Sequence, residues 1–102
     1  MTNKKTLSVA SRYWGELQFE DLPSEELEHG LAIANSPIFH WVIFDIKSGL
    51  TIVRGCRTRK IALEEYEEFI TDKDSMNRLD KSRASLTYKD RCLELERHKL
   101  YV

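Results

Sequence analysis

Alternation of apolar and polar residues predicts two short strands near the start of the chain. Within residues 6–20, four apolar residues alternate with polar neighbours: Leu7, Val9, Leu17 and Phe19. Gly15 lies between the two pairs and predicts a bulge or a bend there. Residues 1–5 are polar, and we expect them to be disordered.

The next segment, residues 21–34, has the features of a helix. Asp21 and Pro23 suit a first helical turn, because a carboxylate accepts orphan backbone N–H groups and proline is tolerated there. Three apolar residues then follow at helical spacing: Leu27, Leu31 and Ala34. Pro37 predicts the end of this helix, since it disfavours helical geometry in the preceding residue.

The most apolar run, residues 38–46, predicts a strand with two apolar faces, which we place in the middle of a sheet. Residues 45–49 have turn chemistry, and Gly49 is available for positive φ. Residues 50–54 then return antiparallel, so the sequence predicts a hairpin.

The second half of the chain predicts helices. Residues 61–70 carry one apolar stripe among glutamates: Leu63, Tyr66, Phe69 and Ile70. Residues 71–75 are a break with capping side chains, and residues 76–99, which lack proline and glycine, predict further helix with a join near 85–87.

These elements predict one α+β domain over residues 1–102. The expected order is β-β-α-β-β-α-α, with an antiparallel sheet of three to four strands and helices packed on one face. The length of 102 residues suits a single domain with one core.

Composition excludes some functions. The net charge of -1 argues against bulk electrostatic capture of nucleic acid or of an anionic membrane. No stretch approaches membrane-spanning length, and no signal peptide is recognised. With only two cysteines, Cys56 and Cys92, we expect reduced thiols in a cytoplasmic protein.

The charges are segregated along the chain. Residues 16–28 carry six acids and no base, and a short basic run follows the predicted hairpin: Arg54, Arg57, Arg59 and Lys60. Guanidinium groups suit phosphates or carboxylates, so this run is a candidate anion or nucleic-acid contact. The glutamates that follow would repel DNA, and the simpler interpretation is a solvated strand end or Arg–Glu pairing.

Four leucines recur every seven residues: Leu79, Leu86, Leu93 and Leu100. On one helix this spacing forms a single apolar seam. The intervening core positions are mostly charged, which argues against a long parallel coiled coil. The seam is therefore expected to dock on the domain's own sheet, with a dimer interface as the alternative.

The aromatic residues have similar alternatives. Trp14 and Trp41 are candidates for an interface, although core packing is the ordinary role of aromatic residues in one small domain. A small-ligand pocket between sheet and helices would be lined from Trp14, Phe39, Trp41 and Tyr66.

No catalytic, metal or cofactor motif is recognised in the sequence. Histidines and cysteines stand in no short paired spacing, and no nucleophile elbow or phosphate-binding loop is present. We therefore expect a non-enzymatic protein without a cofactor or metal. The preferred function is a protein-interaction or self-associating module, as a homodimer or with a protein partner. Nucleic-acid binding and small-ligand binding are the alternatives.

Overall fold

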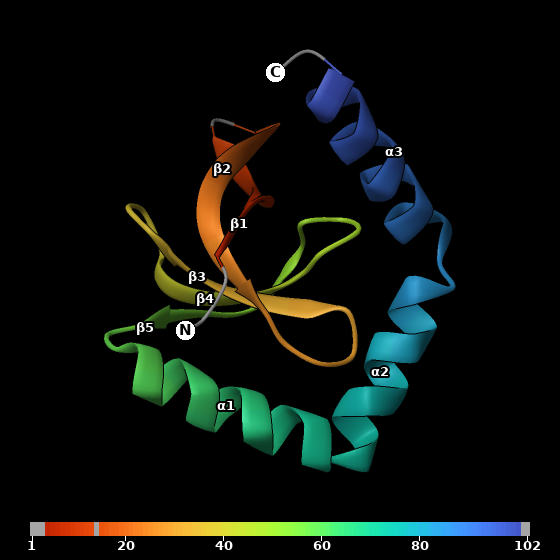
Figure 1. Cartoon of the computed structure of the whole chain (residues 1–102). Helices are drawn as coiled ribbons and strands as arrows, with labels where there is room; N and C mark the ends of the chain where they lie inside the picture. Colours follow the sequence, from red (N-terminus) through yellow and green to blue (C-terminus); the bar gives the residue numbers. More distant parts are fainter. Residues whose placement is uncertain (1–3, 14, 101–102) are drawn as a thin grey trace.

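The protein is an α+β fold with a five-stranded antiparallel sheet and three helices in the part that the computed structural model describes, residues 4–13 and 15–100 (Figure 1). The strands are β1 (Lys5–Tyr13), β2 (Glu16–Glu26), β3 (Leu31–Ser36), β4 (His40–Asp45) and β5 (Thr51–Cys56). The helices are α1 (Arg59–Thr71), α2 (Lys73–Arg83) and α3 (Leu86–Leu100). The predicted class and antiparallel sheet are confirmed, whereas the predicted strand number and element order are wrong.

The two strands predicted within residues 6–20 are confirmed, are longer than predicted, and form a hairpin. β1 pairs with β2 from Lys5, opposite Ser24, to the turn at Gly15, where φ is +82°. Lys5 therefore belongs to a strand, although it falls within the segment expected to be disordered, and residues 1–3 lie outside the described residues.

The predicted helix over 21–34 is wrong, because this segment continues β2 and then forms β3. The turn between them has His29 and Gly30 at positive φ, +63° and +72°, as a tight two-residue hairpin turn requires. Pro23 is tolerated because β3 pairs only with Ser24–Glu26, so the missing N–H lies outside that ladder.

The middle strands bury both of their faces, as predicted for residues 38–46. Alternate residues of β3 and β4 enter two separate clusters. The first cluster includes Ala32, Ala34, Val42 and Phe44. The second includes Leu31, Ile33 and Ile43, together with Ala62 and Tyr66 of α1. β4 lies between β3 and β5, so its interior position in the sheet is confirmed.

The sheet curls until β1 meets the turn that follows β4. The Ala10 N–H donates to the Gly49 carbonyl at 2.8 Å. Gly49 has a φ of +75°, and a Cβ there would lie 2.9 Å from the Ser8 carbonyl oxygen. Only glycine fits this close approach of two backbones.

The helices begin and end close to the predicted positions. Thr58 caps α1 by accepting from the Ile61 N–H at 3.1 Å, and Asp72 caps α2 by accepting from Ser75. The predicted join near 85–87 is found one residue earlier, where Ala84 and Ser85 separate α2 from α3.

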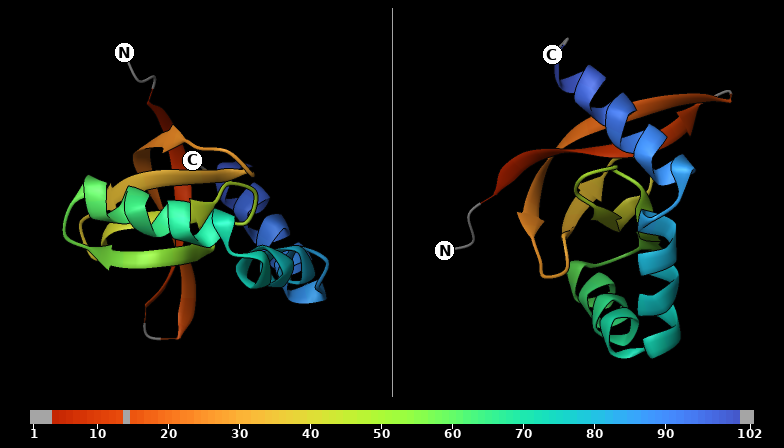
Figure 2. Two further views of the ribbon diagram at one scale, coloured as in Figure 1. Left: turned by 90° about the horizontal axis from the view of Figure 1, so that it is seen from below. Right: turned by 90° about the vertical axis from the view of Figure 1, so that its right-hand side faces the viewer.

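The three helices do not share one face of the sheet. α1 packs on the face that carries the second cluster, whereas α3 runs beside the β1–β2 hairpin (Figures 1 and 2). α2 connects them around the sheet (Figure 2). The expectation of helices stacked on one face is therefore wrong for α3. Among the described residues, no helix has the length and apolarity needed to cross a membrane.

Candidate interaction surface on the last helix

A capping side chain sets the start of α3, and two buried residues define the side of the helix that faces the domain. The Ser85 hydroxyl accepts from the Tyr88 N–H at 3.1 Å, which caps the first turn. Tyr88 and Leu95 then face the body of the domain and are buried. Seven residues separate them, which places both on the same side of a helix.

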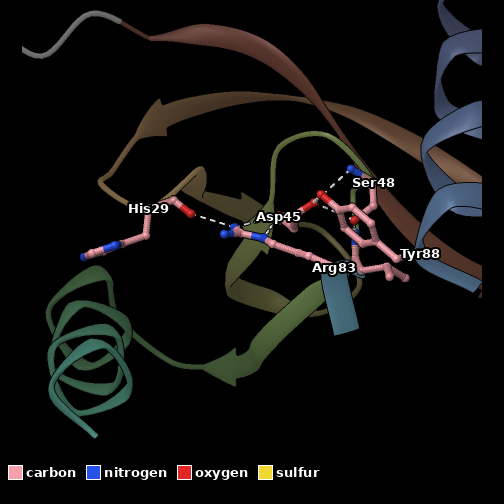
Figure 3. Close-up of polar contacts among 6 residues, drawn as sticks. His29, Asp45, Ser48, Arg83 and Tyr88 are labelled. Carbon is pink, nitrogen blue, oxygen red and sulfur yellow. Dashed lines mark hydrogen bonds and ion pairs between the residues drawn. The ribbon is translucent and has the colours of Figure 1, made fainter. Parts of the chain in front are cut away.

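A buried carboxylate holds the start of α3 against the sheet (Figure 3). Asp45, at the end of β4, is only 3% exposed. Its Oδ2 accepts from the Tyr88 hydroxyl at 2.9 Å and from the Ser48 hydroxyl and N–H at 2.7 and 3.0 Å. Its Oδ1 accepts from Arg83 Nε and Nη2 at 3.1 and 2.8 Å. Arg83 Nη2 also donates to the His29 carbonyl at 2.6 Å, so one cluster joins two turns to the α2–α3 junction.

The cluster is a set of satisfied contacts. Burial, reinforced by the carboxylate of Asp45, raises the pKa of Tyr88 well above its ordinary value. The phenol therefore stays protonated and donates. Among the described residues, no buried side-chain polar atom lacks a hydrogen-bond partner. The arrangement therefore fits a structural tether.

A second tether holds the other end of α3. His98 Nε2 lies 2.9 Å from Asp21 Oδ1, and the Ser8 hydroxyl donates to the same oxygen at 2.6 Å. The His98 ring also packs against Phe19, with 5.2 Å between ring centroids. Burial alone would raise the pKa of Asp21, but the hydrogen bonds from Ser8 and His98 and the charge of His98 hold it below its usual value.

The opposite side of α3 carries a row of exposed leucines. Leu86, Leu93 and Leu100 are 78%, 55% and 79% exposed, whereas Leu79 is buried on α2. We call these three residues the leucine row. The expectation that the heptad leucines dock on the domain's own sheet is therefore wrong for three of them. The break at Ala84 also places Leu79 on a separate helix.

Four charged residues flank the leucine row. Lys89 and Glu96 lie on one side of it, and Asp90 and Arg97 lie on the other, because each is three or four residues from Leu93. All four are exposed. Within the chain, Arg97 pairs with Glu94 at 3.0 Å, an exposed pair of little energetic weight.

The four residues of the basic run have different surroundings. Arg59 pairs with Glu25 of β2, so the acidic and basic segments meet within one chain. The Arg54 guanidinium lies 5.5 Å from the centroid of the Phe39 ring. Arg57 and Lys60 are exposed, and for them the described residues contain no carboxylate at ion-pair distance. A phosphate-binding edge made from all four residues stays a prediction, with Arg59 already paired within the chain.

The aromatic candidates are separated as well. Trp14 lies outside the described residues. Trp41 is half-buried and packs on the second cluster, whereas Phe39 packs on the first. Tyr66 is buried, and its hydroxyl accepts from the Glu28 N–H at 3.2 Å. Among the described candidates, the sheet separates Phe39 from Trp41 and Tyr66, so these three do not line one pocket.

The soft ligands for metals are also dispersed. Cys56 and Cys92 are both free thiols. Burial, with the nearby charge of Glu65, raises the pKa of Cys56, which makes its thiolate scarce at neutral pH. No group of three or more His, Cys, Asp or Glu side chains in the described part of the chain is placed to hold a metal ion.

Sequence reasoning missed the residues that position the surface. Asp45 was interpreted only as turn chemistry, and Arg83 only as a charge that interrupts a leucine seam. Their contact spans 38 positions of sequence. The sequence contained one sign that the helix expected over 21–34 was wrong. Gly30, directly after His29, lies inside that expected helix, where glycine is unfavourable.

Comparison with known proteins gives no relative from which to transfer a function. No protein-family model matches the chain, and no curated protein or solved structure is significantly similar to it. The functional argument therefore depends on the geometry of this chain alone.

Proposed function

We propose that this chain is a non-catalytic protein-interaction module that associates with a second copy of itself through α3. The observation that carries the proposal is the leucine row, three large apolar side chains aligned on the solvent side of a helix. Single exposed leucines are ordinary on protein surfaces, but an aligned series of them is typical of an interaction face.

The charges beside the leucine row are complementary to a second copy, and the helix dipoles favour its antiparallel orientation. With Leu93 at the two-fold axis, Leu86 of one copy meets Leu100 of the other. Lys89 then faces Glu96 and Asp90 faces Arg97, so both flanks are complementary. Antiparallel helices also align their dipoles favourably, whereas parallel helices do not.

The size of the face predicts a weak, reversible dimer. α3 has 15 residues, so at ~1.5 Å per residue the helix is about 22 Å long. A contact of one such helix buries roughly a few hundred Å² on each copy, below the ~800 Å² of a standard stable interface. The association is therefore expected to depend strongly on concentration.

Sedimentation of the intact chain tests the proposal. The native chain should shift from monomer to dimer between about 10 μM and 1 mM, the range of weak interfaces. Changing Leu86, Leu93 and Leu100 together to glutamine should abolish the shift. Ile38 and Ile61 are also exposed apolar residues, so their double change to glutamine is the matched control. A native chain that stays monomeric throughout would refute the proposal.

Nucleic-acid binding through the basic run has less support. Arg59 is already paired with Glu25, so the other three basic residues are left to make phosphate contacts. Three such contacts provide little affinity at physiological salt. We therefore favour protein association over nucleic-acid binding.

A further inference from the structure

A cleft of about 590 Å³ lies between α3 and the curled sheet, on a different side of α3 from the leucine row. Its apolar lining includes Leu17 of β2, Phe39 directly before β4 and Leu50 directly before β5. This volume is within the usual range for small-molecule sites.

Two arginines enter this cleft from different elements. Arg54 comes from β5 and Arg91 from α3, and they are the charged side chains among the described residues that line it. Among the described residues, neither has a carboxylate within ion-pair distance. Two guanidinium groups beside one apolar hollow therefore leave charged donors available to an anionic ligand.

We infer that this cleft binds a small organic anion, meaning a carboxylate or phosphate monoester attached to an apolar body. The guanidinium forks of Arg54 and Arg91 suit the oxyanion, because they donate paired hydrogen bonds to planar or tetrahedral oxygens. The apolar body would lie against Leu17 and Leu50. Hydroxyl groups of Ser11, Thr51 and Thr87 line the same cleft and can donate to further oxygens.

The walls of the cleft are organised before a ligand arrives. Arg54 is stacked on Phe39 at 5.5 Å, which limits the orientations of its guanidinium. The helix that carries Arg91 is tethered on both sides of it, by Tyr88 three residues before and by His98 seven residues after. A ligand therefore loses less binding energy to ordering the Arg54 side chain and the cleft wall.

This inference does not depend on self-association. Arg91 lies two residues before Leu93, so the two side chains point about 160° apart around the helix. A ligand in the cleft leaves the leucine row accessible. A chain that stays monomeric can still bind the anion, and a chain that dimerises can still lack it, so failures of the two proposals are distinguishable.

Titration of the full chain by NMR tests the inference with four probes. Benzoate and phenyl phosphate each carry an oxyanion on an aromatic ring, inorganic phosphate lacks the apolar body, and benzyl alcohol lacks the charge. At concentrations up to about 10 mM, as suits fragment-sized ligands, benzoate or phenyl phosphate should shift the amide signals of Ser11, Thr51 and Thr87. Inorganic phosphate and benzyl alcohol should bind at least roughly tenfold more weakly.

Charge-matched variants separate the site from general electrostatics. Arg54→Gln and Arg91→Gln should each weaken the binding of the better probe roughly tenfold, the loss expected for a charge-assisted hydrogen bond. The control R57Q/R78Q removes the same charge from exposed residues outside the cleft and should bind like the native chain. Equal losses in R54Q/R91Q and R57Q/R78Q would overturn the inference. No localised shift with either aromatic anion, or equal binding of benzyl alcohol, would also overturn it.

Discussion

Removal of the Tyr88 hydroxyl should loosen α3 measurably. The change Tyr88→Phe keeps the buried ring, which is 9% exposed, and deletes the 2.9 Å hydrogen bond to Asp45. Asp45 retains four other hydrogen bonds, from Ser48 and Arg83. The free energy of unfolding should therefore fall by about 1.5–3 kcal/mol, the value of one hydrogen bond to a charged group.

The matched control is Tyr66→Phe. Tyr66 is 5% exposed, and its hydroxyl accepts from the neutral Glu28 N–H at 3.2 Å. This change should lower the free energy of unfolding by only about 0.5–1.5 kcal/mol. Urea unfolding followed by circular dichroism measures both variants, provided that their m-values match. If Tyr88→Phe proves no more destabilising than Tyr66→Phe, Asp45 is not the charged anchor of α3.

Three further outcomes are expected. The pKa of Asp21 is lowered in the fold, so its contribution to stability is present above the unfolded pKa near 3.8 and is lost as the pH falls through the folded pKa. The free energy of unfolding, measured across acid pH, should therefore decline less steeply in D21N than in the native chain. Gly49→Ala should destabilise the fold by at least about 2 kcal/mol, because strain at positive φ adds to a clash with the backbone. Gly15→Ala should cost only the strain of about 1 kcal/mol, because a Cβ there meets nothing within 4 Å, and thermal unfolding compares the two variants. The thiol of Cys56 should react slowly with a maleimide at neutral pH, because burial raises its pKa; mass spectrometry of the C92S variant measures the rate, and modification as fast as that of free cysteine would contradict this account.

Local patterns predicted the elements whose signals lie close together in sequence. The hairpin of β4 and β5 followed from an apolar run and a turn with Gly49. α1 followed from its apolar stripe, and the helical character of residues 76–99 followed from their lack of proline and glycine. Residues 21–34 failed because Leu27, Leu31 and Ala34 have helical spacing by chance. Strand pairing overrode the local preference: β1 pairs with β2 up to Ser24, and β4 pairs with β3 over Leu31–Ser36.

The sequence predicted the leucine row, but it did not predict that the row faces solvent. The spacing of Leu86, Leu93 and Leu100 shows that they share one face of a helix, and spacing alone does not show which face is buried. Tyr88 and Leu95 decided the orientation through contacts with the sheet. Those contacts join residues 43 positions apart in the case of Tyr88 and Asp45, so no local window contains them.

The most direct test of self-association through α3 is a charge-exchange cycle measured by sedimentation. Lys89→Glu and Glu96→Lys should each weaken the dimer, because each single change places like charges opposite one another. The double variant K89E/E96K should restore the native dissociation constant, since antiparallel helices pair residue 89 of one copy with residue 96 of the other. A double variant weaker than either single variant would contradict the antiparallel arrangement, and equal association of all four proteins would place the interface elsewhere.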